Sequence, residues 1–183
     1  MEDFEPMRDF FHRRAAKKLN DLAAGVRLMN QRTESHRGNF VFPGSDYLDD
    51  IEIDNQLVGE VDYGINPLGD RLYINMIEIH PEYRRKGIAL GVLWNLWLKH
   101  QVHIVPISQY GTSYRFWSLA RARFAAAGAC IEGEIRGDDE LDLAKQRWQH
   151  LVPESENERS IRKYWEWVAS EHAAGRPAGP GIL

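Results

Sequence analysis

The sequence contains a single cysteine, Cys130, among its 183 residues. A lone thiol cannot form a disulfide within the chain, and zinc sites built on paired cysteines are excluded as well. A run of about eighteen apolar residues, which a membrane-spanning helix requires, is also missing. The first six residues include three acidic ones and no basic one, whereas a secretory signal begins with basic residues and continues with apolar ones. We therefore expect a cytoplasmic protein without a membrane partner.

An excess of basic residues is likewise absent, since the formal net charge is −4 at pH 7. A protein that binds nucleic acid mainly through its phosphates carries the opposite balance of charge. We expect no nucleic-acid partner on this ground. A local basic track, built from the N-terminal helix with Arg115, Arg121 and Arg123, stays open as an alternative.

The length of the chain suffices for one hydrophobic core and is short for two. We expect a single domain over residues 1–172. Glycine and proline recur through residues 173–183, a composition that forms no regular element. This last segment is predicted to be a flexible tail.

The first half of the chain predicts one helix followed by strands. Apolar residues recur at spacings of three and four over residues 7–29, which predicts an amphipathic helix, and a polar stretch follows at 30–39. Segments 47–53 and 56–65 predict two strands joined by a tight turn at Asp54-Asn55, and 71–80 predicts a third. These three strands would form an antiparallel meander.

The second half alternates between helices and strands. The apolar segment 87–100 predicts a helix pressed against the sheet. Further predicted elements are a strand at 102–108, a helix at 113–127, a strand at 129–136, and helices at 141–150 and 156–172. The fold class is therefore α/β of the α+β kind, with a mixed, mostly antiparallel central sheet flanked by helices and with additional C-terminal helices.

One junction between a strand and a helix carries chemical information. The strand ends in Ile77-Glu-Ile79-His-Pro81, and a basic turn, Arg84-Arg-Lys-Gly87, leads into the apolar helix. Backbone N–H groups at the start of a helix are unpaired and partly positive, and a glycine lets the main chain approach a diphosphate. The turn lacks the endings of a Walker A loop or a Rossmann fingerprint. It predicts a pyrophosphate-binding turn of another kind.

This junction resembles the cofactor loop of the GNAT superfamily of acetyl-CoA-dependent N-acyltransferases. That loop reads Arg/Gln-x-x-Gly-x-Gly/Ala and follows a strand ending in an apolar-x-apolar-x-Pro pattern. Both patterns are present here, as Arg84-x-x-Gly87-x-Ala89 and Ile77-x-Ile79-x-Pro81. The resemblance implies acetyl-CoA as cosubstrate, with the pyrophosphate on main-chain amides from Arg85 to Ala89 and the pantetheine arm along Ile77 and Ile79. The implied cofactor-binding residues are Ile77, Ile79, Arg84, Arg85, Lys86, Gly87, Ile88 and Ala89.

The general acid of the family does not carry over to this chain. The resemblance implies a tyrosine four residues before a Gly-Phe pair, where it protonates the departing thiolate, and this chain has Phe124 before Gly128-Ala129. A phenyl ring cannot donate a proton. Tyr110, Ser113 and Tyr114 lie near the start of the same predicted helix, and we consider them as replacements or as ordinary loop and capping residues.

The general base has two candidates on the third predicted strand. Glu78 and His80 alternate to the face opposite Ile77 and Ile79, and either could accept a proton directly or through water. Glu78 is the first choice, because a carboxylate in an otherwise apolar strand is unusual. We predict no metal site, since His100 and His103 have no third ligand nearby in the sequence.

The function expected from the resemblance is transfer of an acetyl group from acetyl-CoA to a primary amine of a small molecule or a protein. Acidic residues on the first predicted hairpin favour a cationic acceptor. Two alternatives remain, a CoA-binding module without catalysis and an acyltransferase acting on nucleic acid. The helices beyond residue 141 depart from the family pattern, and we expect them to form either a homodimer interface or a lid over the acceptor.

Overall fold

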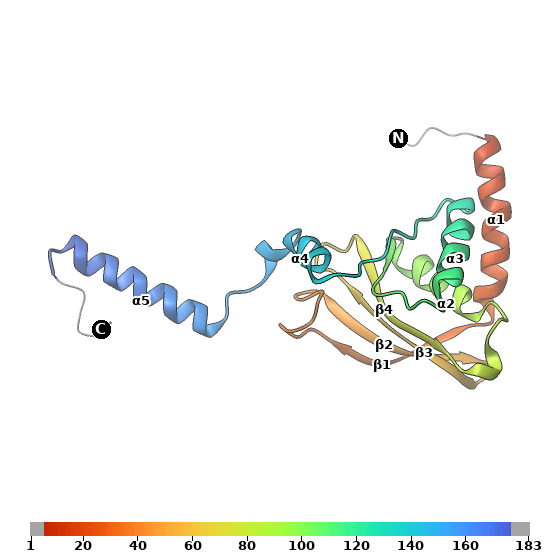
Figure 1. Ribbon diagram of the computed structural model, residues 1–183, viewed down its shortest axis with the longest axis horizontal. Helices are drawn as coiled ribbons and strands as arrows, with labels where there is room; N and C mark the ends of the chain where they lie inside the picture. Colours follow the sequence, from red (N-terminus) through yellow and green to blue (C-terminus); the bar gives the residue numbers. More distant parts are fainter. Residues whose placement is uncertain (1–5, 177–183) are drawn as a thin grey trace. The chain divides into compact units, whose positions relative to one another are not determined.

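A five-stranded sheet dominates the computed structural model, which describes residues 6–176. Its strands are β1 (Arg27–Glu34), β2 (Ser45–Ile53), β3 (Gln56–Ile65), β4 (Arg71–Ile79) and β5 (His103–Pro106), and they lie side by side in this order. The first four strands pair antiparallel, and β5 runs parallel to β4. The mixed, mostly antiparallel sheet flanked by helices confirms the predicted fold class (Figure 1).

Three helices cover one face of this sheet: α1 (Pro6–Ala24), α2 (Ile88–His100) and α3 (Tyr114–Ala126) (Figure 1). They share the main hydrophobic core with alternate residues of the strands, among them Ile51, Val61 and Leu72, which are fully buried. Period-two alternation sends their neighbours along each strand to the opposite face. The helical layer therefore defines an inner face of the sheet, and the other face is the outer one.

A smaller core covers the start of β4 on the outer face. It contains Tyr73 of β4, Val105 of β5, Val41 and Trp148, with Phe40 packed against them. The Trp148 ring lies edge-on to Phe40 and its Nε1–H donates to the Phe42 carbonyl oxygen at 3.2 Å. Trp148 follows α4 (Asp138–Gln146) and precedes the short helix η2 (Gln149–Leu151). The segment after α3 thus closes one end of the outer face.

Helix α1 is seated closely on the N-terminal half of α2. A Cβ at Gly91 of α2 would lie 2.6 Å from the Leu22 carbonyl oxygen, so only glycine permits this approach. Asn95, one turn further, donates from its side-chain amide to the carbonyl oxygens of Ala23 and Val26 at 3.1 and 3.0 Å. These bonds tie α2 to backbone acceptors at the C-terminus of α1, where the Ala23 carbonyl oxygen also accepts from the Val26 N–H at 3.0 Å.

The prediction for the first helix was wrong at its C-terminal end. The helix stops at Ala24, and residues that we expected in its last turn and in a polar stretch form β1 instead. This strand is an edge strand of the sheet, pairs with β2 alone among the described residues and is exposed at most positions. Its sequence carries no period-two alternation because neither of its faces is fully buried.

The predicted strand over 129–136 is also absent as a continuous element. Only two isolated parallel bridges form there, Ile104 with Ile131 and Ile107 with Ile135. The alternation of apolar residues does place Ile131 in the core, where it is buried. The residues between the two bridges form no continuous ladder of hydrogen bonds with β5. The predictions for 47–53, 56–65, 71–80, 87–100, 102–108 and 113–127 agree with β2, β3, β4, α2, β5 and α3, with small shifts of their ends.

The chain divides into two compact units, residues 1–151 and residues 152–183. In the second unit, helix α5 (Glu156–Ala173) begins with a capping box, in which the Ser155 hydroxyl accepts from the Glu158 N–H at 3.2 Å. Arg162 donates to both Glu154 and Glu166 along the same unit. The expected single domain over 1–172 stays a prediction, and most of the predicted tail lies outside the described residues.

Across residues 6–176, every helix is too short or too polar to cross a membrane.

Candidate functional site

Strands β4 and β5 are paired only over the first half of β4. Arg71 to Ile74 pair with His103 to Pro106. The Ile107 N–H still donates to the Ile74 carbonyl oxygen at 2.9 Å, but the next amide, Ser108, donates to Ile135 on the other side. Within the described residues, Asn75–Ile79 therefore has no partner strand on the β5 side. The sheet is open along this half of β4, which we call the free edge.

A β-bulge lies at the point where the two strands part. The register of β3 and β4 shifts there, because Asp62 pairs with Met76 whereas Tyr63 pairs with Ile74, which leaves Asn75 as the extra residue. A bulge bends its strand and increases the local twist. It thereby turns the second half of β4 away from the direction of β5.

The hydrogen bonds to β3 show which backbone groups of the free edge point outward. The His80 N–H donates to the Val58 carbonyl oxygen at 2.8 Å, so the groups of His80 point toward β3. Backbone groups alternate in direction along a strand, so those of Ile77 and Ile79 point to the open side. These are the two residues that the sequence pattern assigned to the pantetheine arm.

The free edge leads to the N-terminus of α2. The first hydrogen bond of this helix runs from the Gly91 N–H to the Gly87 carbonyl oxygen at 3.0 Å. The amides of Ile88, Ala89 and Leu90 precede it and have no such acceptor in the part of the chain that the structure describes. Unpaired amides and the helix dipole make this end of the helix attractive to an anion.

Two left-handed residues shape the turn that precedes the helix. Arg85 has φ of 62° and Gly87 has φ of 81°. A Cβ at position 87 would also lie 2.8 Å from Leu22 Cδ2 of α1. The positive φ favours glycine at position 87, and a Cβ there would also push against the end of the Leu22 side chain, whether or not a ligand binds.

Arg84 is attached to the end of the free edge. Its Nε–H donates to the Ile79 carbonyl oxygen at 2.7 Å. Its Nη2 lies 3.9 Å from Glu78 Oε1, and both side chains are more than half exposed, so this ion pair contributes little. Although it lies in an otherwise apolar strand, Glu78 is an exposed carboxylate. The outer face is uncovered here, because the smaller core reaches only the start of β4.

The two base candidates, Glu78 and His80, do share one depression on the outer face. A cavity of about 240 Å³ is lined by Asp50, Leu57, Gly59, Glu60, Glu78 and His80. Among the described residues its charged side chains are carboxylates, contributed by β2, β3 and β4. This outer depression is acidic and borders the strand that carries the free edge.

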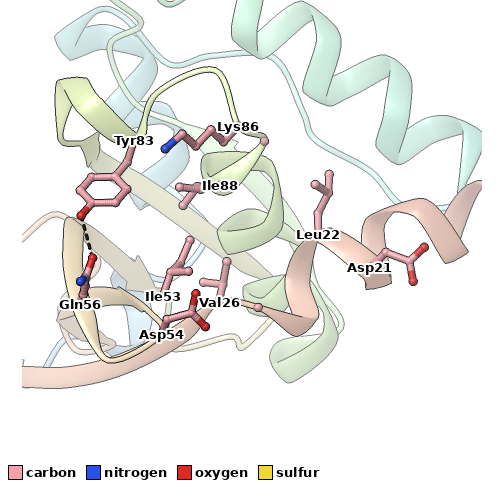
Figure 2. A pocket seen from close by; sticks show the side chains of 11 residues that line it. Asp21, Leu22, Val26, Ile53, Asp54, Gln56, Tyr83, Lys86 and Ile88 are labelled. Atoms are coloured by element: carbon pink, nitrogen blue, oxygen red, sulfur yellow. Dashed lines mark hydrogen bonds between the residues drawn. The ribbon is translucent and has the colours of Figure 1, made fainter.

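A larger cavity of about 340 Å³ reaches the turn from the side of β2 and β3 (Figure 2). Tyr83 and Lys86 line it, with the Lys86 Nζ 5.0 Å from the centroid of the Tyr83 ring. The Tyr83 hydroxyl donates to Gln56 Oε1 at 2.9 Å, which ties the turn to β3. Asp21 and Asp54 also border this cavity, and their carboxylates would repel a phosphate. No pattern within the sequence pointed to Tyr83 or Gln56, because their contact depends on the tertiary fold.

The candidates for the general acid lie after β5, at the start of α3. Tyr110 is 81% exposed and Tyr114 is 60% exposed. The Ser113 hydroxyl donates to the Tyr110 carbonyl oxygen at 2.8 Å, which is a local turn contact. Phe124 is fully buried and lies edge-on to Trp94 at 5.1 Å between ring centroids. The position expected to hold the acid is thus part of the main core.

A buried polar group lies at the other end of α2, away from the free edge. Asp49 is 2% exposed and accepts from the Tyr63 hydroxyl at 3.1 Å and from Asn30 Nδ2 at 2.7 Å. Burial and the neighbouring Asp49 carboxylate raise the pKa of Tyr63. The His100 ring packs beside the Tyr63 ring, and burial lowers the pKa of His100. This group stabilises the fold. In the described residues, no three His, Cys, Asp or Glu side chains are arranged to hold a metal ion.

The comparisons with known proteins address the same part of the chain. A family description, the acetyltransferase (GNAT) family, matches residues 7–96, which include α1, the first four strands, the basic turn and the start of α2. Over residues 7–96 the chain is therefore similar to the GNAT acetyltransferase family. No curated protein matches the chain.

One solved structure to which the chain is similar is the ribosomal-protein-alanine N-acetyltransferase from Brucella melitensis biovar Abortus 2308. It is 14% identical, with a TM-score of 0.27, and the match covers 61% of this chain and 66% of that chain. The chain thus spans slightly less than two thirds of that protein.

Proposed function

We propose that this protein transfers an acetyl group from acetyl-CoA to a primary amine. The observation that carries the proposal is the free edge of β4, which a short helical turn, η1 (Pro81–Tyr83), and the basic turn connect to the unpaired amides at the N-terminus of α2. The edge offers outward backbone groups at Ile77 and Ile79 to an amide-rich arm. The helix end, with Arg85 and Lys86 beside it, offers a site for a diphosphate.

The chemistry of CoA fits these groups in their order along the chain. Its pantetheine arm contains two amides, which can pair with a strand edge, and its pyrophosphate carries the negative charge that the helix N-terminus attracts. Acetyl-CoA supplies a thioester whose carbonyl carbon an uncharged amine can attack. The residues proposed to hold it are Ile77, Ile79, Arg85, Lys86, Gly87, Ile88 and Ala89, and Arg84 belongs to the same turn.

Glu78 and His80 are proposed to handle the proton of the acceptor. An amine is protonated at neutral pH and must lose a proton before it attacks, so a carboxylate or imidazole near the free edge would assist. Both side chains line the outer depression, whose carboxylates would also attract a cationic amine. Tyr110 and Tyr114 are proposed as donors to the leaving thiolate, since both are exposed beyond the end of β5.

The binding step is tested by calorimetric titration of the protein with CoA and acetyl-CoA. Arg85→Glu combined with Lys86→Glu reverses two exposed charges beside the helix end and should weaken CoA binding at least about tenfold. We avoid Gly87→Glu, because its Cβ would collide with Leu22 and a loss of binding would not be informative.

Lys17→Glu combined with Lys18→Glu on α1 is the matched control, since it changes the net charge equally at exposed positions. It should bind CoA like the unmodified protein. Equal weakening by both pairs would show a general charge effect, and absence of CoA binding by the unmodified protein would refute the proposal.

A CoA-binding module without catalysis is the second candidate. Phe124 favours it, because the side chain at the position of the family acid is buried and cannot donate a proton. Release of free thiol from acetyl-CoA in the presence of a panel of polyamines, aminoglycosides and lysine peptides separates the two. Tight CoA binding without thiol release for any amine would support the second candidate.

A further inference from the structure

Arg84 carries the positive charge that would make it a phosphate ligand, but its contacts indicate another role. The Nε–H, the donor nearest the main chain, is bound to the Ile79 carbonyl oxygen at 2.7 Å. That carbonyl points to the open side of β4, where no other strand accepts or donates. An acceptor at a strand edge is ordinarily satisfied by a neighbouring strand or by solvent, and here a side chain satisfies it.

The bond closes a short ring at the corner of the proposed site. It connects the last residue of β4 to a residue five positions later. Within the ring, the Tyr83 N–H donates to the His80 carbonyl oxygen at 2.9 Å, and the Arg84 N–H donates to Pro81 at 3.3 Å. The left-handed Arg85 follows immediately. The ring therefore sets where the turn and the helix amides lie relative to the free edge.

We infer that Arg84 is a positioning residue, which holds the pyrophosphate turn in register with the strand edge through the Ile79 carbonyl. This inference rests on the proposed function. The hydrogen bond also limits which backbone groups the free edge can offer to a ligand. The Ile79 carbonyl oxygen already accepts from Arg84, so the pantetheine arm can pair only with the Ile77 N–H and carbonyl and with the Ile79 N–H. The charge of Arg84 is secondary in this account.

Three substitutions separate the hydrogen bond from the charge. Gln places an N–H donor at the same number of bonds from Cα as the arginine Nε, without charge. Met has a similar length but no donor. Lys keeps the charge but has a methylene where the arginine has Nε. Arg123→Gln, an exposed arginine on α3, controls for the loss of one positive charge.

The measurement is the dissociation constant of CoA and of ADP for each variant, together with thermal unfolding without ligand. Arg84→Gln and Arg123→Gln should bind CoA within about threefold of the unmodified protein. Arg84→Met and Arg84→Lys should bind CoA about tenfold more weakly, as expected for loss of one charge-assisted hydrogen bond. ADP, which has the diphosphate but not the pantetheine arm, should lose less, because only CoA spans both the edge and the turn.

Two results would overturn the inference. Arg84→Lys binding CoA normally while Arg84→Gln fails like Arg84→Met would show that charge is what matters. Equal binding by all variants would show that the bond has no role in the site. If the unmodified protein does not bind CoA, the proposed function itself fails. In that case, an unfolding temperature that is lowered in Arg84→Met and Arg84→Lys but unchanged in Arg84→Gln would show that the hydrogen bond has a structural role only.

Discussion

The two halves of β4 are built for different tasks. Residues 71–74 pair on both sides, contribute to the main core through Leu72 and Ile74, and contribute to the smaller core through Tyr73. Residues 75–79 pair only with β3, expose Met76 and Glu78, and end at the basic turn. The bulge at Asn75 separates them. A single strand thus combines an anchored half with a half left open for a ligand.

The largest expected effect is a loss of stability in the anchored half. Leu72→Ala removes a fully buried side chain from the main core and should lower the free energy of unfolding by about 2–5 kcal/mol. Met76→Ala, in the open half, removes a side chain that is 39% exposed and should cost less than about 1 kcal/mol. Urea unfolding followed by circular dichroism measures both. Similar losses for the two would contradict this division of the strand.

The next effect concerns the helix that begins where the open half ends. Alanine normally stabilises a helix interior relative to glycine, by about 1 kcal/mol. Gly91→Ala should do the opposite and destabilise the protein by about 1–3 kcal/mol, because its Cβ would lie 2.6 Å from the Leu22 carbonyl oxygen. Gly137→Ala, at a glycine with open space around it, is the control. If Gly91→Ala instead stabilises the protein, α1 can shift away from α2 at little cost in free energy.

A smaller effect on stability and a specific effect on binding are expected for Ile77→Pro. The Ile77 N–H points away from β3, so proline removes no ladder bond and is tolerated as on an edge strand. It does remove the donor proposed for the pantetheine arm. CoA affinity should fall about tenfold while ADP affinity changes little, as measured by titration. Glu78→Pro would break the ladder to β3 and should unfold more readily. An Ile77→Pro protein that binds CoA normally would exclude pairing of the arm at this edge.

The smallest effect is a dependence of stability on pH near the C-terminus of α2. Burial lowers the pKa of His100 below the ordinary value of 6.5. As the pH falls, the unfolded chain therefore takes up a proton at His100 before the folded protein does. The free energy of unfolding does not depend on the protonation of His100 above about pH 6.5, and it decreases as the pH falls below that value. His100→Gln should therefore show a smaller decrease in melting temperature between pH 7 and pH 5. An unchanged decrease would mean that other groups govern this pH range.

Residues near the free edge were predictable to different degrees. The pattern of Ile77, Ile79, Arg84 and Gly87 is local, because a strand, a turn and a helix start follow each other in the chain. The environment of Glu78 was not predictable, because it depends on where the segment around Trp148 stops covering the outer face. The bond from Arg84 to Ile79 and the contact of Tyr83 with Gln56 depend on the geometry of the turn and on a distant strand.

The errors in the fold have the same origin. The edge strand β1 is polar on both faces and gains its structure only from pairing with β2, so its sequence resembled the end of a helix and a loop. The segment 129–136 alternates as a strand does, but only Ile131 and Ile135 meet the backbone of the β5 segment. In both cases the deciding interaction is with residues far away in the sequence.

The sequence by itself determined the fold class, the positions of β2 to β5 and α2 to α3, and the basic turn, because each rests on periodicity or on residues adjacent in the chain. The tertiary structure alone decided that β4 parts from β5 at Asn75, that Gly91 is needed for the seat of α1, and that Arg84 binds the Ile79 carbonyl. Pairing register, close approach of helices and the engagement of a carbonyl are properties of two segments together, and no pattern within one segment specifies them.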